Sequence, residues 1–566
     1  MKTSRIITLA ALLSAAFTLS AQELLLPLYD DYQLNISKQA YSSDYRFHSS
    51  MRSWTESQIN AVSNIDSIRQ TQYIEKHFKK EWVQQLWNSA FNTDFAPVNG
   101  NDGLTYFGDI QIDKSDKTDK GKYFIAVNPL FDFQTGWEQY SDHSLWRNTR
   151  GAEVKGTIGD KFAFYTSARE NQAVFPSYMR SYCIDNKVLP GQGAYKTYGD
   201  YGFDFTYCSA YLNFCPTKWL SATMGYGKNF IGDGYRSLIL SDNAFSYPYL
   251  KLTGTIWNIQ HTCLYTQMID RSNTISSTIG YARKYITMHY TDWAVTRRFN
   301  ISLFDAIIWS AEDGTGFRGI DIDYLNPIVF LRPVEYTVGP SPDNAIMGAN
   351  MSFIFGKNTV LYGQVVLDEF KLSHVIARDG WHGNKQAFQI GVKDYDAFNV
   401  DNLFLQGEFN YVRPYMYTHY GQSQNYAHYN QALAHPLGAN FWEVVARTQY
   451  NYKRLYLNYK FTFALYGEDD NSDLSNGHCG HNIFLNYQYY LGYTTHNELG
   501  HYVGQGIETH LYTHDLVLSY LVNPTYNFNI FVEVMQRRLT TATTENNTIV
   551  LNLGLRTSLE RLYFDF

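Results

Sequence analysis

Apolar and polar residues alternate with a period of two in several segments of the chain. In residues 455–465 every odd position is apolar, while the even positions are mostly polar or small. The same alternation occurs in residues 123–133, 220–228 and 483–493. Successive side chains of a β-strand point to opposite faces, so each segment is predicted to be a strand with one apolar face. Each is about ten residues long, the length that a tilted strand needs to cross a bilayer.

Composition separates a membrane barrel from a soluble β-sandwich, which also alternates. Aromatic residues make up 17% of the chain and charged residues only 17%, against about a quarter charged in an ordinary soluble domain. Aromatic girdles at two lipid interfaces and a polar lumen produce such a bias. One strand per roughly 25 residues from residue 104 onward gives on the order of 16 to 18 strands. We therefore expect an all-β fold, an antiparallel transmembrane β-barrel, in residues 104–566, with extracellular loops.

The two ends of the sequence point to the outer membrane. Lys2 and Arg5 precede an apolar stretch with small residues, which predicts that residues 1–21 are a secretory signal peptide. After it, no run of about 18 apolar residues occurs that could form a transmembrane helix. The last residues, 562–566, form an alternating, aromatic-rich tail that ends on Phe. We expect this tail to be the last strand and to close the barrel.

An N-terminal extension, residues 22–103, has a different pattern. Apolar residues recur every four positions between residues 67 and 91, which predicts one amphipathic helix. Because the helix precedes the first predicted strand, we expect it on the periplasmic side or against the barrel mouth. It would serve as a lid packed on the barrel or as a docking element for an envelope partner. Aromatic stripes at helical spacing are usually packing faces, which favours the lid.

Linear motifs of catalysis and metal binding are absent from the sequence. It contains no Gly-x-Ser-x-Gly, His-Glu-x-x-His or P-loop pattern, and a net charge of -7 is not that of a nucleic-acid-binding protein. The acidic run 468–473 begins like a calcium loop, but Leu474 replaces the required Gly, so we expect a solvated acidic loop. The histidines between residues 478 and 514 match no standard metal spacing. We expect no catalytic residue, metal or cofactor.

Charged residues near predicted strand ends are interpreted as structural groups of the lumen, where ion pairs are the simplest arrangement. They are Arg169, Glu170, Asp233, Arg236 and Asp242.

The five cysteines are an odd number, so at least one thiol is unpaired or bonds elsewhere. Cys208 and Cys215 are seven positions apart on one predicted strand, which points them to opposite faces and forbids a mutual disulfide. All five are interpreted as small apolar residues.

Several short motifs resemble those of known outer-membrane proteins. Residues 148–151 (NTRG), 170–176 (ENQAVFP), 190–193 (PGQG) and, most specifically, 231–243 (IGDGYRSLILSDN) resemble RemB, a gliding-motility outer-membrane protein of the Bacteroidetes phylum. Farther along, residues 343–344 (DN), 361–364 (LYGQ) and 367–370 (LDEF) are similar to the Wzi family of capsule-assembly barrels. Proteins of the Wzi type resemble the predicted architecture of this chain, because they have periplasmic helices on a wide barrel. They act as lectins for capsule.

The resemblance implies a non-enzymatic protein of the cell outer membrane that supports gliding motility or binds and organises surface polysaccharide. Its partners would be outer-membrane lipid together with exopolysaccharide or envelope proteins of gliding and secretion. Aromatic faces suit sugar rings, and one stretch supplies five candidates for glycan contact: Tyr415, Tyr417, Tyr420, Tyr426 and Tyr429.

Two other functions stay open at this point. The predicted strand number is large enough for a channel or porin that passes a small solute. An outer-membrane lipid-modifying enzyme would arrange Ser, His and an acidic or amide group across neighbouring strands, which no linear motif reveals.

Overall fold

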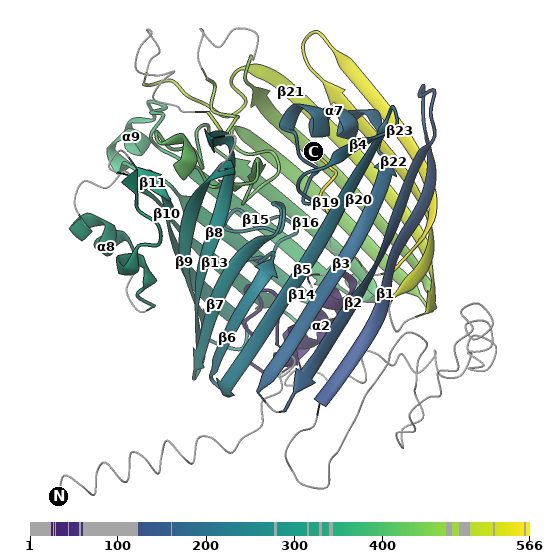
Figure 1. The fold of residues 1–566 in the computed structure, drawn as a ribbon, viewed down its shortest axis with the longest axis horizontal. Helices are drawn as coiled ribbons and strands as arrows, with labels where there is room; N and C mark the ends of the chain where they lie inside the picture. The colour runs from purple at the N-terminus through teal and green to yellow at the C-terminus, as the bar shows by residue number, and fades with distance from the viewer. Residues whose placement is uncertain are drawn as a thin grey trace, which may run out of the picture.

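Eighteen antiparallel strands close into a barrel in the computed structural model of the protein (Figure 1). Each barrel strand pairs with the next one along the chain, and β23 pairs with β1 to complete the ring. The connections at one end are short turns, whereas those at the other end carry helices and long loops. Barrels of this kind have short periplasmic turns and longer extracellular loops. The end that carries α7 and α9 therefore faces the outside of the cell.

The structure describes residues 30–43, 45–55, 123–159, 161–276, 280–313, 316–327, 331–338, 343–470, 478–485, 498–523, 527–557 and 562–566, with isolated positions 24, 25, 28, 58, 59 and 559. The barrel strands are β1 (Tyr123–Glu138), β2 (Leu145–Ile158), β3 (Phe162–Val174), β5 (Gly202–Thr217), β6 (Leu220–Gly227), β7 (Tyr247–Ile256), β8 (Ile259–Ser276), β9 (Gly280–Ala294), β10 (Phe299–Ser310), β13 (Asn344–Phe355), β14 (Thr359–Leu367), β15 (Gln386–Tyr395), β16 (Leu403–Val412), β19 (Phe441–Tyr452), β20 (Leu455–Glu468), β21 (Ile507–Asn523), β22 (Phe528–Thr540) and β23 (Glu545–Arg556). The other elements are α2 (Asp30–Ser42), α7 (Ser177–Asn186), β4 (Lys196–Tyr198), β11 (Glu312–Asp313), β12 (Gly316–Phe317), η1 (Ile322–Leu325), α8 (Leu331–Val338), α9 (Leu372–Ala377), η2 (Ala397–Asn399), η3 (Gln422–Gln424), β17 (Ala427–His428) and β18 (Gln431–Ala432).

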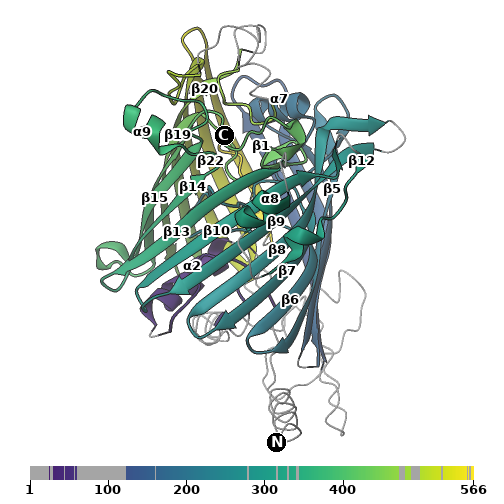
Figure 2. The same cartoon turned by 90° about the vertical axis from the view of Figure 1, so that its left-hand side faces the viewer.

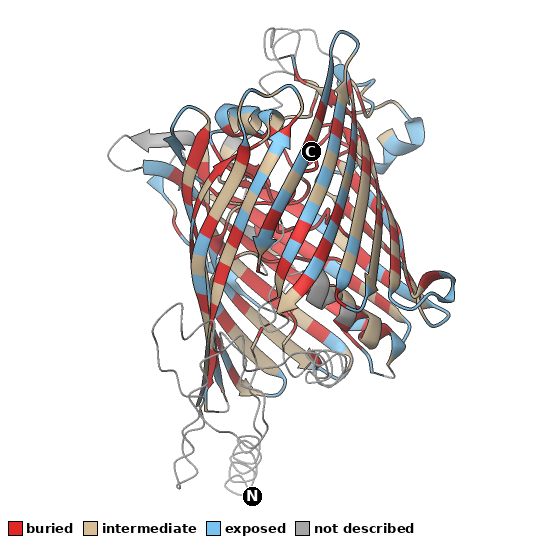
Figure 3. Cartoon of the chain, turned by 90° about the vertical axis from the view of Figure 1, so that its right-hand side faces the viewer, coloured by how far each residue is buried: buried red, intermediate tan, exposed pale blue. Residues whose placement is uncertain are grey.

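Burial alternates along the strands, and the polar face is the buried one. In β15, Phe388 and Ile390 are 39% and 64% exposed on the outer face, whereas Gln389 and Lys393 on the inner face are 4% and 6% exposed. Figure 3 shows the same alternation along neighbouring strands. A soluble protein buries its apolar face, but a barrel in lipid exposes it. The alternation in sequence therefore comes from an apolar outer wall and a polar inner wall.

Three of the four predicted strands are confirmed, and so are the all-β fold and the expected strand number. Residues 123–133 lie in β1, residues 220–228 form β6 apart from the last, and residues 455–465 lie in β20. In the fourth segment, residues 483–485 form a turn, and residues 486–493 lie outside the described part of the chain.

The predicted signal peptide and the helix predicted at residues 67–91 lie outside the described residues, as do residues 104–122. The helix observed in the N-terminal extension is α2, which the sequence pattern did not predict. Tyr41 at its end packs in one cluster with Val360, Tyr395 and Phe404 of the inner wall. These wall residues lie next to periplasmic turns, so α2 occupies the periplasmic end of the lumen. None of the helices in the described part of the chain is long and apolar enough to span a bilayer.

The C-terminal tail does not form the last strand, so that expectation is wrong. β23 ends at Arg556 and pairs with β1 over seven residue pairs, compared with fourteen between β1 and β2. Residues 562–566 lie inside the lumen, where Tyr563 and Asp565 are buried. The physical reason is the charge of Asp565, which would be costly on a lipid-facing wall and has an arginine partner, Arg236, in the lumen.

Removal of residues 562–566 tests this arrangement. Because β23 pairs with β1 without the tail, we expect the truncated chain to form the barrel and to keep its far-ultraviolet circular dichroism. We expect it to unfold at a lower temperature, since buried Arg236 loses one of its carboxylate partners. Loss of the β-sheet signal on truncation would instead show that the tail is needed to close the wall.

Candidate functional site

The connection between β6 and β7 folds back into the lumen and fills its centre. Residues 231–243 are buried without exception, and we call residues 228–246 the plug segment. The backbone passes against the inner wall at Gly232, which has a φ of 148°. Residues with a side chain rarely adopt this φ, and a Cβ here would lie 2.5 Å from Nε2 of Gln364 on β14, so the position favours glycine. The most specific motif in the sequence is therefore an internal packing element.

Amide and carboxylate side chains of the inner wall hold the plug segment by its main chain. Glu408 of β16 accepts hydrogen bonds from the N–H groups of Tyr235 and Arg236 at 2.7 and 3.1 Å. Gln364 accepts one from the N–H of Leu238 at 2.8 Å. Buried main-chain groups need hydrogen-bond partners, and a segment without regular structure cannot supply them itself. The wall supplies them here.

The same wall side chains bond to one another across the strands. Gln389 of β15 donates to Asn410 of β16 at 2.9 Å and to the carbonyl of Arg236 at 3.1 Å. Asn410 in turn donates to Glu408 and to Glu443 of β19, both at 3.0 Å. The polar inner wall thus forms a connected network with the plug segment, and its geometry depends on that segment being in place.

A buried ionic cluster joins the plug segment, the wall and the tail. Arg236 lies 2.8 Å from Glu443 and 3.1 Å from Asp565. Lys460 of β20 lies 3.2 Å from Asp565, and His435 lies 2.8 Å from Glu443. Burial opposes ionisation of Asp565, but the charges of Arg236 and Lys460 outweigh it and hold the pKa of Asp565 well below its ordinary value. The carboxylate of Asp565 therefore stays ionised at physiological pH.

The N-terminal segment 45–55 packs against the other side of the plug segment. Met51 forms an antiparallel bridge with Ile231. Ser49 donates a hydrogen bond to the carboxylate of Asp233 at 2.6 Å. The lumen is therefore filled from both ends of the chain as well as from the β6–β7 connection.

The five tyrosines expected to contact glycan do not lie together. Tyr417 and Tyr426 are buried in the lumen against the plug segment, whereas Tyr415 is buried among the extracellular loops beside His478; the hydroxyls of all three donate to main-chain carbonyls. Tyr429 is half-buried. Tyr420 lies in the extracellular loop between β16 and β19 and is 38% exposed. While the lumen is packed, the three buried rings cannot stack on a sugar, and Tyr420 offers the most open ring of the five.

The five charges assigned to the lumen fall on both faces of the wall. Arg169 is buried on the inner face of β3, but the adjacent Glu170 is exposed on the outer face. The expectation that Glu170 lies in the lumen is wrong, because neighbouring residues of a strand point in opposite directions. Arg236, Asp233 and Asp242 are buried in the plug segment. Asp233 accepts hydrogen bonds from the wall and the N-terminal segment, and Asp242 accepts one from the tail.

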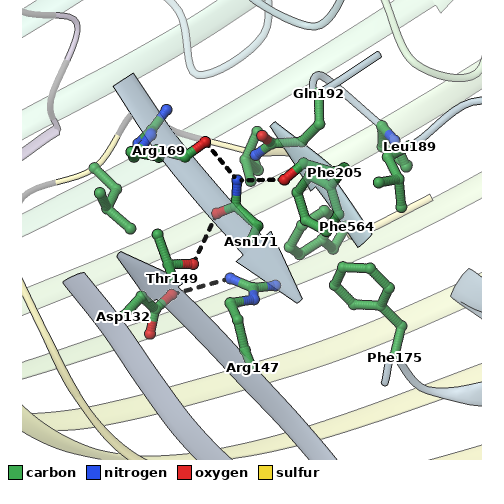
Figure 4. A pocket seen from close by; sticks show the side chains of 13 residues that line it. Asp132, Arg147, Thr149, Arg169, Asn171, Phe175, Leu189, Gln192, Phe205 and Phe564 are labelled. Atoms are coloured by element: carbon green, nitrogen blue, oxygen red, sulfur yellow. Dashed lines mark hydrogen bonds and ion pairs between the residues drawn. The ribbon is translucent and has the colours of Figure 1, made fainter. Parts of the chain in front are cut away.

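A small cavity lies between the wall, the turn at residues 189–192 and the tail (Figure 4). Arg147 of β2 donates to Asp132 of β1 at 3.1 Å, and Thr149 of β2 donates to Asn171 of β3 at 2.8 Å. The cavity volume is about 20 Å³, about what one water molecule needs. Residues of three of the motifs quoted above meet here, yet the space is too small for a sugar. Three rings close it: Phe175, Phe205 and Phe564.

Acidic and histidine side chains near the extracellular end serve local structure. Asp469 is buried and accepts hydrogen bonds from His478 at 3.0 Å and from the N–H of Cys479 at 2.6 Å. The expectation of a solvated loop is wrong for Asp469, because its carboxylate orders the turn that follows. Residues 471–477 and His496 lie outside the described part of the chain. Within the described part, no group of three or more His, Cys, Asp or Glu is placed to hold a metal.

All five cysteines are free thiols. Cys208 is exposed on the outer face of β5 and Cys215 is buried on the inner face. The prediction that they point to opposite faces and form no mutual disulfide is confirmed.

A Ser–His–Asp grouping at the β1–β2 turn lacks the geometry of a catalytic relay. Oγ of Ser141 lies 3.1 Å from Nδ1 of His143, and the carboxylate of Asp142 lies 3.0 Å from the same nitrogen. In a catalytic triad the two partners bond to opposite nitrogens of the imidazole ring. This grouping therefore stabilises the turn.

Polar and aromatic side chains gather at the extracellular mouth from two separate loops. In the loop between β14 and β15, the rings of His374 and Trp381 stack with centres 4.7 Å apart. Lys385 donates to Glu369 at 2.9 Å and to the carbonyl of Thr418 at 3.1 Å, which ties this loop to the one that carries Tyr420. No linear pattern joins these residues, because the two loops are far apart in sequence. We call the following side chains the mouth surface: Glu369, Lys371, His374, Trp381, His382 and Tyr420.

The wall and the lumen together define the class of protein. An apolar outer wall, a polar inner wall and long loops at one end are the features of an integral outer-membrane β-barrel. In this barrel, the plug segment, the N-terminal segment and the tail occupy the lumen, and the loops at the mouth offer the accessible polar and aromatic surface.

Comparison with solved structures agrees with this class. The fold is similar to that of Wzi of Escherichia coli, described as an outer membrane protein involved in group 1 capsule assembly and as a carbohydrate-binding β-barrel. The TM-score is 0.53 at 11% identity, and the match covers 94% of this chain and 100% of Wzi. OprD of Pseudomonas aeruginosa gives a TM-score of 0.41 at 10% identity, covering 77% of this chain and 95% of OprD. OccAB2 of Acinetobacter baumannii gives a TM-score of 0.39 at 10% identity, and the match covers 76% of this chain and 97% of OccAB2.

At these identities the likeness to Wzi concerns the fold alone. No protein-family model matches the sequence, and no curated protein matches it. The resemblance to RemB therefore has no support from these comparisons.

Replacement of Arg236 by Met tests the ionic cluster. The substitution leaves Glu443 and Asp565 buried without their shared partner, so we expect a loss of about 3 to 5 kcal/mol in the free energy of unfolding. Thermal and chemical unfolding in detergent would measure it. Arg538→Met is the matched control, because the ion pair of Arg538 with Glu545 is half-exposed and should contribute little. Equal effects of the two substitutions would contradict the proposed importance of the cluster.

Asp368 predicts a dependence of stability on pH. Burial raises the pKa of Asp368 to about 7, and Lys385 offsets this only in part. The native state then holds a proton that the unfolded chain has lost above its ordinary pKa of 3.8, so stability falls as the pH rises from about 4 to 7. Asp368→Asn keeps an acceptor for the N–H of Tyr417 and should remove this loss. Relative to the parent protein, the variant should gain on the order of 2 kcal/mol between pH 5 and 8.

Unfolding in detergent at the two pH values would measure this difference. Asp401→Asn, at an exposed position, should leave the pH profile of the parent protein unchanged. A variant at Asp368 that follows the parent profile would contradict the prediction.

Proposed function

We propose that the protein is a non-enzymatic surface barrel that binds polysaccharide through the mouth surface. The observation that carries this proposal is a barrel with the fold of a carbohydrate-binding outer-membrane protein whose lumen is packed with its own chain. A packed lumen leaves the extracellular loops as the surface where a large ligand can be met. The proposed partner is an exopolysaccharide outside the cell.

The chemistry of the mouth surface suits sugar. Aromatic rings provide flat apolar faces for sugar rings, and nearby charged and polar groups can bond to hydroxyls. Tyr420 lies against the ring of His419 with centres 4.2 Å apart, which fixes its orientation. Nζ of Lys371 lies 5.6 Å from the ring centre of Trp381. The charges of Glu369 and Lys371 flank these rings, so both hydrogen-bond donors and acceptors are present.

The lumen does not favour a channel for small solutes. Wide passage requires an open path, but the plug segment is bonded to consecutive strands of the wall and to the tail. Displacement of the plug segment to open a wide path would separate the buried ion pairs of Arg236 with Glu443 and Asp565. Loss of one partner from a buried pair costs about 3 to 5 kcal/mol, so such opening would be rare.

A role in gliding motility rests on the resemblance of residues 231–243 to RemB. These residues are buried in the plug segment, so they cannot contact a motility partner from the cell surface. The gliding role therefore stays an expectation that deletion of the gene and assays of surface spreading would examine separately.

Binding of purified protein to polysaccharide from the surface of its own host cell tests the proposal. We expect the detergent-solubilised protein to bind, and Tyr420→Ala to weaken binding about two- to tenfold, because an aromatic contact contributes roughly 0.5 to 1.5 kcal/mol. Calorimetry or immobilised polysaccharide would measure the affinity. Tyr420→Phe should bind nearly as well as the parent if the ring face is the contact.

Tyr140→Ala is the matched control, because Tyr140 is 91% exposed at the β1–β2 turn, outside the mouth surface. Its binding should equal that of the parent protein. The proposal would be contradicted if the parent protein did not bind, or if Tyr140→Ala and Tyr420→Ala lowered the affinity equally.

A further inference from the structure

The outer wall of β8, β9 and β10 carries a group of polar side chains that are buried, although they lie on the face that is exposed elsewhere along the same strands. On β10, Leu303 is 50% exposed on the outer face. Two positions farther along the same face stands Asp305, which is buried. Its register neighbour on β9 is His289, and the next on β8 is Cys263, and both are buried too. A lipid-facing wall does not normally carry such residues, so something covers them.

The connection between β10 and β13 provides the cover. After β10 the chain folds down over the outer wall, and Figure 2 shows α8 in front of β9 and β10. We call residues 316–327 and 331–338 the lateral cover. Trp309 of the wall packs against Tyr324 with ring centres 5.1 Å apart, and Leu331 joins the same cluster. The covered positions of β10 lie in its second half, toward the extracellular end.

Wall side chains bond to the main chain of the lateral cover. Nε1 of Trp309 donates to the carbonyl of Gly319 at 3.0 Å. The hydroxyl of Tyr265 donates to the carbonyl of Leu325 at 2.9 Å. Asp305 accepts from the N–H of Leu331 at 2.6 Å, and Nε2 of His261 lies 2.7 Å from the carbonyl of Pro327. Irregular main chain is tolerated beside lipid only where protein satisfies its polar groups. The outward-facing polar side chains of the wall form these hydrogen bonds with the main chain of the lateral cover.

The outer side of the lateral cover is apolar. Phe317, Ile320 and Ile322 are 76%, 60% and 80% exposed. Arg318 forms ion pairs with Asp321 at 2.6 Å and with Asp343 at 2.7 Å, so these three side chains together carry one net negative charge. These apolar side chains continue the exposed apolar surface of the neighbouring wall, where Leu303 and Met347 are 50% and 43% exposed.

We propose that the lateral cover lies in the outer leaflet of the membrane and that Phe317, Ile320 and Ile322 contact lipid acyl chains. Three observations support lipid as the occupant: the position on the extracellular half of the outer wall, the satisfied main chain, and the continuity with the apolar wall. The exposed carboxylate of Asp323 must reach the headgroup region, because charge in the hydrocarbon is costly. The lateral cover is therefore an interfacial element.

Spin labels on single cysteines in proteoliposomes test this placement. The background carries Cys208→Ala and Cys479→Ala, because these two thiols are not buried. Labels are placed at Ile322→Cys and, as a second site, at Phe317→Cys. Leu303→Cys provides the lipid reference on the wall. Asp142→Cys provides the water reference, since its side chain is 82% exposed at an extracellular turn.

Electron paramagnetic resonance then compares the accessibility of each label to oxygen, which concentrates in lipid, and to a water-soluble nickel complex. We expect the ratio of oxygen to nickel accessibility at residues 317 and 322 to match that at residue 303 and to exceed that at residue 142 several-fold. A ratio like that at residue 142 at both sites would place the lateral cover in water and overturn the proposal. Labels shielded from both reagents would indicate a second copy or another protein on this face and would overturn it too.

Discussion

The ion pairs of Arg236 join parts of the chain that are 207 and 329 residues apart in sequence. Taking charges out of water is costly, and a buried pair holds only when both partners and their hydrogen bonds are present. Glu443 fixes the guanidinium to the wall, and Asp565 fixes it to the tail. The plug segment, the wall and the tail therefore occupy one mutually dependent arrangement.

This dependence explains why the inner wall is polar although many of its side chains contact protein and not water. Polar side chains on the inside of a barrel can face water or bond to protein. Here Gln364 and Glu408 bond to the main chain of the plug segment, so the wall specifies a path for a segment that has no regular structure. Because these wall side chains are committed to internal bonding, the proposed contact with polysaccharide is placed at the mouth surface, where loops from separate strands meet.

The alternation in residues 455–465 predicted β20 because lipid outside and polar groups inside impose one period on a whole strand. The tail alternates in the same way, yet only the position of Arg236 explains why Asp565 turns inward. Residues 231–243 have no period at all, since each contacts a different element, so their burial could not be predicted. Glu369 and Tyr420 come from different loops, and the site they form depends on the closed barrel. The polar residues Asp305, His289 and Cys263 interrupt the apolar face of β8 to β10 at positions that another segment covers, which no strand pattern could reveal.

The contact between β23 and β1 differs from every other contact in the wall, because no turn connects the two strands. Main-chain hydrogen bonds over seven residue pairs hold this contact. On the inside, the tail contacts strands on both sides of this contact: Nε of Arg537 on β22 donates to the main-chain oxygen of Phe566 at 3.0 Å, and the ring of Phe564 lies 5.5 Å from the guanidinium of Arg147 on β2. In mechanical terms the tail is a strap, a segment that connects the strands on either side of the seam between β23 and β1. A sideways pull on the wall would have to break the strap before the seam could part.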